Sequence, residues 1–288
     1  MPLSRSPYLD EILRLDPVAD HKRIVHLHVC YEFPFDTTRS LEFALFRTFA
    51  SPRIAALLDA TREFGNRAQK RYDDTDLIIS AMLEHGYDSE IGKRALRRMN
   101  RIHGRFPIEN DDFLYVLSTF VFEPPRWIDR YGWRPTVEHE RLALFHCWRE
   151  IGRRMNIKEI PPEYDTFERF NRDYEREHFR PTPEAARVAR ATRAMFLSWF
   201  PGLPRAVGER AISAILDEPL LEAFGFRHPP RALRHAADAA LKARGRAVRA
   251  LPPRRRPRLR TERRTRTYPR GYVIEELGPP EASAYPAG

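Results

Sequence analysis

The sequence predicts an all-α protein, because helix-start signals, helix-stop signals and a 3–4 spacing of apolar residues recur along most of its 288 residues. At this length the chain can bury a sizeable core, and 42% hydrophobic with 11% aromatic residues is typical of globular proteins. The one convincing extended segment is short and lies near the end, at residues 268–277. We therefore predict one large helical domain with appendages.

The first half of the chain has well-marked helix boundaries. Ser51 followed by Pro52 is typical of an N-cap and a first helical residue. Gly86 ends a second helix, and Asp88 or Ser89 can cap a third that runs to about His103. The stretch 113–122 is apolar on nearly all sides, so it should be buried. After the helix that begins at Ser51, the predicted pieces of this half are 66–85, 88–103, 113–122 and a short one at 124–131.

The second half continues in the same way. Thr136 is placed to cap a long helix that ends at Met155, and Pro161 with Pro162 breaks the chain. The further predicted helices are 165–179, 183–199, 205–216, 219–224 and 230–249. No internal repeat is visible, so the helices should form a single body rather than a repeat array.

The positive charge of the chain is concentrated in one segment. Between Arg244 and Arg266 eleven arginines are opposed only by Glu262, a balance of +10 that equals the net charge of the whole chain. Such a Pro-interrupted run is typical of a solvated, mobile linker. The alternative is a segment that binds a polyanion, either nucleic acid or an anionic membrane. Nucleic acid is the less favoured of these two ligands, because the run has no aromatic residue for base stacking. We divide the chain into an N-terminal extension (1–40), a helical catalytic domain (41–250) and a basic linker with a tail (251–288).

Several features indicate a cytoplasmic location. Cys30 and Cys147 are the only cysteines, which is cytosolic usage, and residues 1–20 have no apolar stretch of the kind found in secretion signals. The longest apolar stretch, 113–122, is about half of what a bilayer requires. We expect no transmembrane segment, whereas peripheral contact with a membrane stays compatible with the basic run.

His103 is the first candidate site residue. It ends an amphipathic helix, and an apolar side chain, Phe106, follows it. Haem needs an imidazole from the protein, an apolar slot for the macrocycle and cations for its propionates. The candidate cations are four arginines on the same helix, Arg94, Arg97, Arg98 and Arg101. The alternative is an ordinary histidine on an arginine-rich surface helix.

Arg71 and Thr75 are the second candidates. Their four-residue spacing puts the guanidinium and the hydroxyl on one helical face, where both could meet a buried anion or a bound oxygen. The alternative is a surface arginine that pairs with Asp74 or Asp76 on its own helix.

The order Arg71, Thr75, His103 resembles the Arg…Thr…His signature of the latex-clearing protein and MpaB family. The resemblance covers about residues 41–278 and is carried by LFRTF (45–49), KRYDDT (70–75), RMNRIH (98–103), DDFLYVL (111–117), GWR (132–134) and YPRGY (268–272). It implies a helical fold with a globin-like core and a b-type haem whose axial ligand is His103. It also implies that Arg71 and Thr75 lie in the haem pocket, and that the reaction cleaves carbon–carbon double bonds of isoprenoid chains with dioxygen.

Two departures from the family modify this expectation. Rubber-cleaving members carry a lysine just before the threonine, able to occupy the far side of the iron, and this chain has Asp74 there. We expect Asp74 to pair with Arg71 and to leave that side open to water or small ligands. Rubber-cleaving members are exported, and the fungal member is membrane-anchored. This sequence shows neither an export signal nor a membrane anchor, so we expect a small hydrophobic substrate inside the cell.

The sequence thus predicts a haem b-dependent oxygenase that acts with dioxygen on an unsaturated, isoprenoid-like molecule. A catalytically inactive haem-binding or interaction protein of the same fold is the alternative, and Asp74 is its best support. Weaker metal sites are His26 and His28 with Cys30 in a strand-like stretch, and Glu175 with His178, which lacks the second pair that a di-iron site needs. Glu63 is a guess for a general base from its position before Arg71.

Overall fold

The computed structural model describes residues 6–279, and this part of the chain contains helices and no strand. The predicted all-α class is therefore confirmed. The N-terminal elements are α1 (Pro7–Ile12), α2 (His21–Leu27), a π-helical turn η1 (His28–Glu32), α3 (Pro34–Thr48) and α4 (Pro52–Ala60). The central ones are α5 (Glu63–His85), α6 (Glu90–His103), α7 (Asn110–Tyr131) and α8 (Glu138–Arg154). The remaining ones are α9 (Tyr164–His178), α10 (Pro183–Leu197), α11 (Arg205–Ala214), α12 (Glu218–Phe224), α13 (Arg231–Arg249) and a 3-10 turn η2 (Ile274–Glu276).

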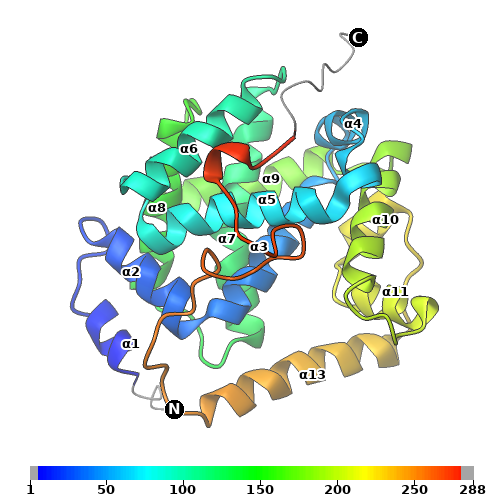
Figure 1. Cartoon of the computed structure of the whole chain (residues 1–288). Helices are drawn as coiled ribbons and strands as arrows, with labels where there is room; N and C mark the ends of the chain where they lie inside the picture. Colours follow the sequence, from blue (N-terminus) through cyan, green and yellow to red (C-terminus); the bar gives the residue numbers. More distant parts are fainter. Residues whose placement is uncertain (1–5, 280–288) are drawn as a thin grey trace.

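α7 is the central helix of the body. It packs against α3, α8, α9 and α13, and most of its side chains are buried (Figure 1). The predicted break before residue 124 is wrong, since α7 continues through Pro124 and Pro125. Each proline removes one backbone donor, but neighbours on several sides hold the helix together.

The N-terminal caps of α6 and α8 compare differently with the prediction. Ser89 caps α6 as predicted, because its hydroxyl accepts a 3.0 Å hydrogen bond from the amide of Gly92. Thr136 does not cap α8. Its hydroxyl and its amide both donate to the carboxylate of Asp129, at 2.7 Å each, and α8 begins after Val137.

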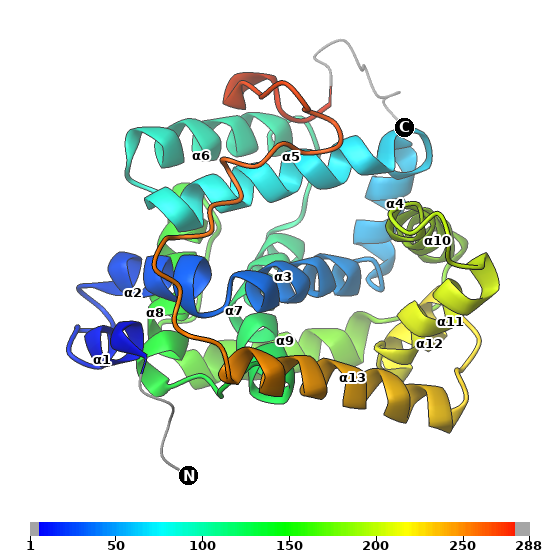
Figure 2. The ribbon, with the colours of Figure 1, turned by 60° about the horizontal axis from the view of Figure 1, so that its bottom comes forward.

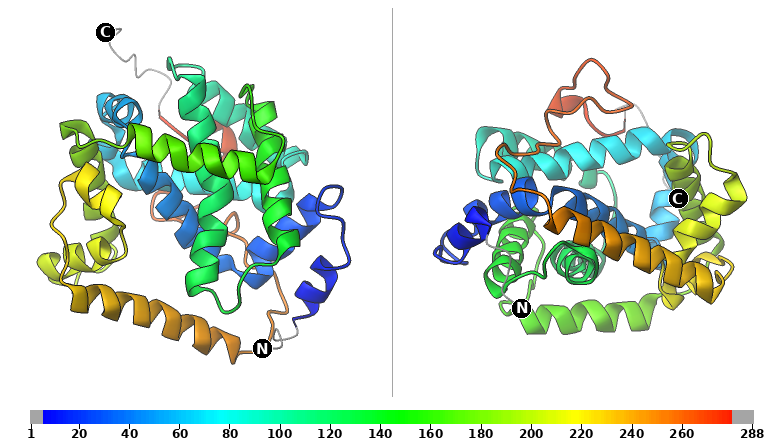
Figure 3. Two further views of the ribbon diagram at one scale, coloured as in Figure 1. Left: turned by 180° about the vertical axis from the view of Figure 1, so that it is seen from behind. Right: turned by 90° about the horizontal axis from the view of Figure 1, so that it is seen from below.

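The N-terminal elements pack on the helical body. α2 lies against α8 and α5, and the stretch that includes His26 and His28 is helical, so the strand-like reading was wrong. Residue 40, the boundary expected for an N-terminal extension, lies inside α3, which packs along α7. At the other end, α13 runs along one side of the molecule beside α11 and α7 (Figure 3).

The expectation of a mobile basic linker is wrong. Figure 2 shows the chain running from the end of α13 past α2 to α5 and α6. We call residues 258–279 the C-terminal strap. The amide of Arg258 donates to the carbonyl of Cys30 at 2.9 Å, and the Arg260 guanidinium pairs with Asp76. The amide of Thr261 donates to Glu84 at 3.1 Å. Carboxylates on α5 therefore hold the strap, and charge counting along the sequence could not reveal this.

The end of the strap also differs from the expected extended segment. Residues 268–277 contain a turn and the 3-10 turn η2, and η2 packs on α6. The Arg94 guanidinium donates to Glu275 at 2.7 and 2.8 Å, and Arg98 donates to the carbonyl of Leu277. The last described residues thus dock onto the body next to α5 and α6.

Candidate functional site

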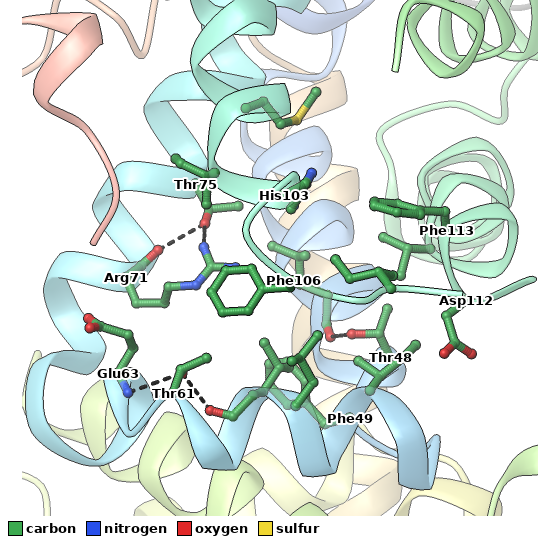
Figure 4. A pocket seen from close by; sticks show the side chains of 18 of the residues that line it. Thr48, Phe49, Thr61, Glu63, Arg71, Thr75, His103, Phe106, Asp112 and Phe113 are labelled. Carbon is green, nitrogen blue, oxygen red and sulfur yellow. Dashed lines mark hydrogen bonds between the residues drawn. The ribbon is translucent and has the colours of Figure 1, made fainter. Parts of the chain in front are cut away.

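A cavity of about 500 Å³ lies between α3, α4, α5, α6, α7 and α10. Its wall is mostly apolar, and His103, Arg71 and Thr75 all belong to it (Figure 4). The structure therefore brings the three residues selected from the sequence to one cavity. A volume of this size is typical of sites for small molecules and cofactors.

His103 is the last residue of α6, and its ring meets Phe113 of α7 edge-on at 5.4 Å between ring centres. Its Nδ1 atom is buried and has no hydrogen-bond partner within residues 6–279. Burial and, to a lesser degree, the charge of Arg71 lower the pKa of His103 to about 4. The imidazole is therefore neutral at physiological pH, which is the form that binds metal ions.

Arg71 and Thr75 contact each other directly on α5. The Thr75 hydroxyl donates to the carbonyl of Arg71 at 2.9 Å and accepts a hydrogen bond from the Arg71 guanidinium. The guanidinium also lies over the ring of Phe64, 5.7 Å from its centre. The expected common face is confirmed, and the threonine orients the arginine within the cavity wall.

Asp74 does not pair with Arg71, so that expectation is corrected. Its carboxylate is buried and accepts hydrogen bonds from Lys70 at 2.7 Å and from the hydroxyl of Tyr268 at 2.5 Å. Lys70 precedes Asp74 by one helical turn and lies on its side of α5, whereas Arg71 is rotated toward Thr75. Asp76, the other suggested partner of Arg71, pairs with Arg260 of the strap.

The four arginines of α6 that the sequence suggested as cations for the haem propionates do not line the cavity. They are Arg94, Arg97, Arg98 and Arg101. Arg94 and Arg98 hold the strap, and Arg97 lies 3.5 Å from Glu90 on the exposed side of its own helix. Among the arginines selected from the sequence as site candidates, Arg71 is the one that lines the cavity.

Several polar wall residues were not among the site candidates taken from the sequence. Glu42, Tyr72 and Asp112 line the cavity from α3, α5 and α7. Tyr72 and Asp112 stand inside the family segments 70–75 and 111–117, but only the tertiary structure places their side chains in the cavity wall. Glu63, the guess for a base, also lines the cavity and forms an ion pair with Arg67 at 2.5 Å.

The cavity suits a haem by the chemistry of its wall. A neutral imidazole with an unpartnered buried nitrogen, mostly apolar walls and the guanidinium groups of Arg53 and Arg71 are the features that such a group requires. The weaker metal sites have other partners: His26 Nδ1 lies 2.7 Å from the carbonyl of Glu84, and His28 pairs with Glu140 at 2.9 Å. Within residues 6–279 no group of three or more His, Cys, Asp or Glu side chains is arranged to hold a metal ion.

A sequence profile described as "ER-bound oxygenase mpaB/B'/Rubber oxygenase, catalytic domain" matches residues 42–269. The chain belongs to this family. It is 28% identical over 240 residues to the ER-bound oxygenase mpaB' of Penicillium brevicompactum, covering 77% of this chain and 57% of that protein. It is 29% identical over 211 residues to mpaB of Penicillium roqueforti (strain FM164), covering 67% and 71%. It is 31% identical over 185 residues to mpaB of Penicillium brevicompactum, covering 58% and 47%.

The match confirms the family resemblance read from the sequence, with nearly the same limits. The chain spans between about half and 71% of the length of these three relatives. Two of the three are matched over less than two thirds of their length. Although the relatives are named ER-bound, none of the helices in residues 6–279 is both long and apolar enough to cross a bilayer.

Proposed function

We propose that this chain is a haem b-dependent oxygenase that acts with dioxygen on an unsaturated, hydrophobic, isoprenoid-like molecule. Membership of an oxygenase family supports the reaction class. The observation that carries the proposal is the neutral His103 imidazole, set in an apolar cavity beside the Arg71–Thr75 pair. The apolar wall supports a hydrophobic substrate.

His103 would hold the haem iron through one ring nitrogen, and the bound haem would supply the iron chemistry that activates dioxygen. Arg71, oriented by Thr75, would provide a fixed positive charge for a propionate or a polar oxygen in the cavity. The apolar side chains around them would bind the hydrocarbon chain of the substrate and exclude water from it.

The absorption spectrum of the purified protein tests this proposal. We expect a Soret band that is lost or strongly weakened in His103→Ala, because this substitution removes the bond between protein and iron. His235→Ala is the matched control, since His235 is exposed on α13, outside the cavity wall. A full, unshifted haem spectrum in His103→Ala would contradict the assignment of the ligand.

Two alternatives to this proposal rest on other features of the chain. An inactive haem protein is favoured by Asp74, which lines the cavity, although Lys70 and Tyr268 of the strap hold its carboxylate in place. A polyanion-binding protein is favoured by the exposed arginines Arg254, Arg255 and Arg256 in the segment that follows α13. Binding through them would weaken steeply with salt and would not require haem.

A further inference from the structure

Glu42 on α3 is one of the carboxylates in the mostly apolar cavity wall. Its side chain is 12% exposed. One oxygen, Oε1, accepts a 2.7 Å hydrogen bond from the Arg39 guanidinium and another from the hydroxyl of Tyr72 on α5. Two donors therefore hold the carboxylate in one orientation from two helices.

The second oxygen, Oε2, has no hydrogen-bond partner within residues 6–279. It is also not among the fully buried polar atoms that lack a partner, so it keeps accessible surface. Because Glu42 lines the cavity, a molecule bound there can reach its side chain. A carboxylate oxygen has up to two further lone pairs for a donor.

The charges around Glu42 favour one kind of ligand. Burial is the main cause that raises the pKa of Glu42, to about 7, and Asp76 acts in the same direction. Arg39, Arg260 and the hydrogen bond from Tyr72 act in the opposite direction. A cationic ligand would meet two arginines, and an anionic one would meet two carboxylates. A neutral hydrogen-bond donor meets neither penalty.

We propose that Glu42 Oε2 binds a hydroxyl group of an otherwise apolar substrate, with Tyr72 and Arg39 as its positioning residues. This inference rests on the proposed function, because it concerns a ligand of the same cavity. The hydroxyl would fix one end of the substrate between α3 and α5, while the hydrocarbon chain lies along the apolar wall. The preferred substrate would then be an isoprenoid-like alcohol or phenol rather than a pure hydrocarbon.

Calorimetric binding of geraniol and of geranyl methyl ether to the purified full chain tests the inference. The two probes share a carbon skeleton, but only the alcohol can donate a hydrogen bond. At pH 8 we expect the ratio of the ether Kd to the alcohol Kd to be about tenfold larger for wild type than for Glu42→Leu, the usual size of one hydrogen bond to a charged group. Glu109→Gln is the control, since Glu109 also lines the cavity but is exposed and should leave the ratio unchanged.

The pH dependence gives a second arm that does not need the leucine variant to fold. The carboxylate predominates above pH 7, so the wild-type ratio should fall between pH 8 and pH 6, and Glu42→Gln should show no such change. Equal ratios in wild type and Glu42→Leu, or equal pH profiles in wild type and Glu42→Gln, would overturn the inference. Failure of wild type to bind either probe would instead contradict the hydrophobic substrate of the proposed function, and this inference with it.

Discussion

Asp74 and Lys70, one turn apart on α5, form a 2.7 Å ion pair that joins this helix to the C-terminal strap. The Lys70 ammonium also donates to the hydroxyl of Tyr268 at 3.0 Å and to the carbonyl of Gly278 at 2.8 Å. Gly278 lines the cavity, adopts a φ of +94°, and has no room for a Cβ because Ile102 of α6 lies against it. The pair therefore helps to hold one part of the cavity wall in place.

Replacing Asp74 by alanine should loosen the strap. The substitution leaves Lys70 without its carboxylate and Tyr268 without its acceptor, which should lower the free energy of unfolding by about 2–3 kcal/mol. Hydrogen exchange should become faster in residues 268–278. Glu222→Ala, on the exposed side of α12, is the control and should change neither quantity. Unchanged exchange in the strap would show that the pair does not fasten it.

Arg260→Ala should be more damaging than the same change at other arginines of the basic run. It leaves the carboxylate of Asp76, whose side chain is 15% exposed, without its partner at 3.0 Å, and loss of one member of a largely buried pair costs about 3 kcal/mol. Arg255→Ala, at an exposed position, should change stability by less than about 0.5 kcal/mol. Equal urea midpoints for the two variants would show that the ion pair between Arg260 and Asp76 does not stabilise the fold.

Acid should destabilise the haem-free protein through His103. Its pKa is about 4 in the fold against 6.5 when unperturbed, so the unfolded chain binds the proton first as the pH falls. The free energy of unfolding should therefore decrease from about pH 6.5 to pH 4, by up to about 3 kcal/mol from this group. His103→Leu should show a correspondingly smaller decrease in urea titrations at the two pH values. Parallel profiles would contradict the buried, neutral state of the ring.

Thr75→Val should reduce activity by releasing the Arg71 side chain, while it changes the stability of the fold only slightly. Valine keeps the shape of threonine but removes the hydroxyl that accepts from the guanidinium, so we expect a stability loss of about 1 kcal/mol or less. Oxygen consumption with an isoprenoid substrate should fall about tenfold, because one charge-positioning hydrogen bond is lost. Thr75→Ser keeps the hydroxyl and should restore most of the rate. A valine variant as active as wild type would remove Thr75 from the proposed site.

The sequence alone determined the all-α class, most helix limits and the family, because these depend on local signals: caps such as Ser89, apolar spacing, and the order Arg71, Thr75, His103. The π-helical turn at His28, the continuation of α7 through Pro124 and the partners of the strap were decided by the tertiary structure. Arg260 and Asp76 are 184 positions apart, and no local rule relates them. The same holds for Glu42 and Tyr72, whose contact depends on how α3 and α5 pack. Neighbours in sequence set each helix, whereas only long-range packing decides which charges it buries and which face the cavity.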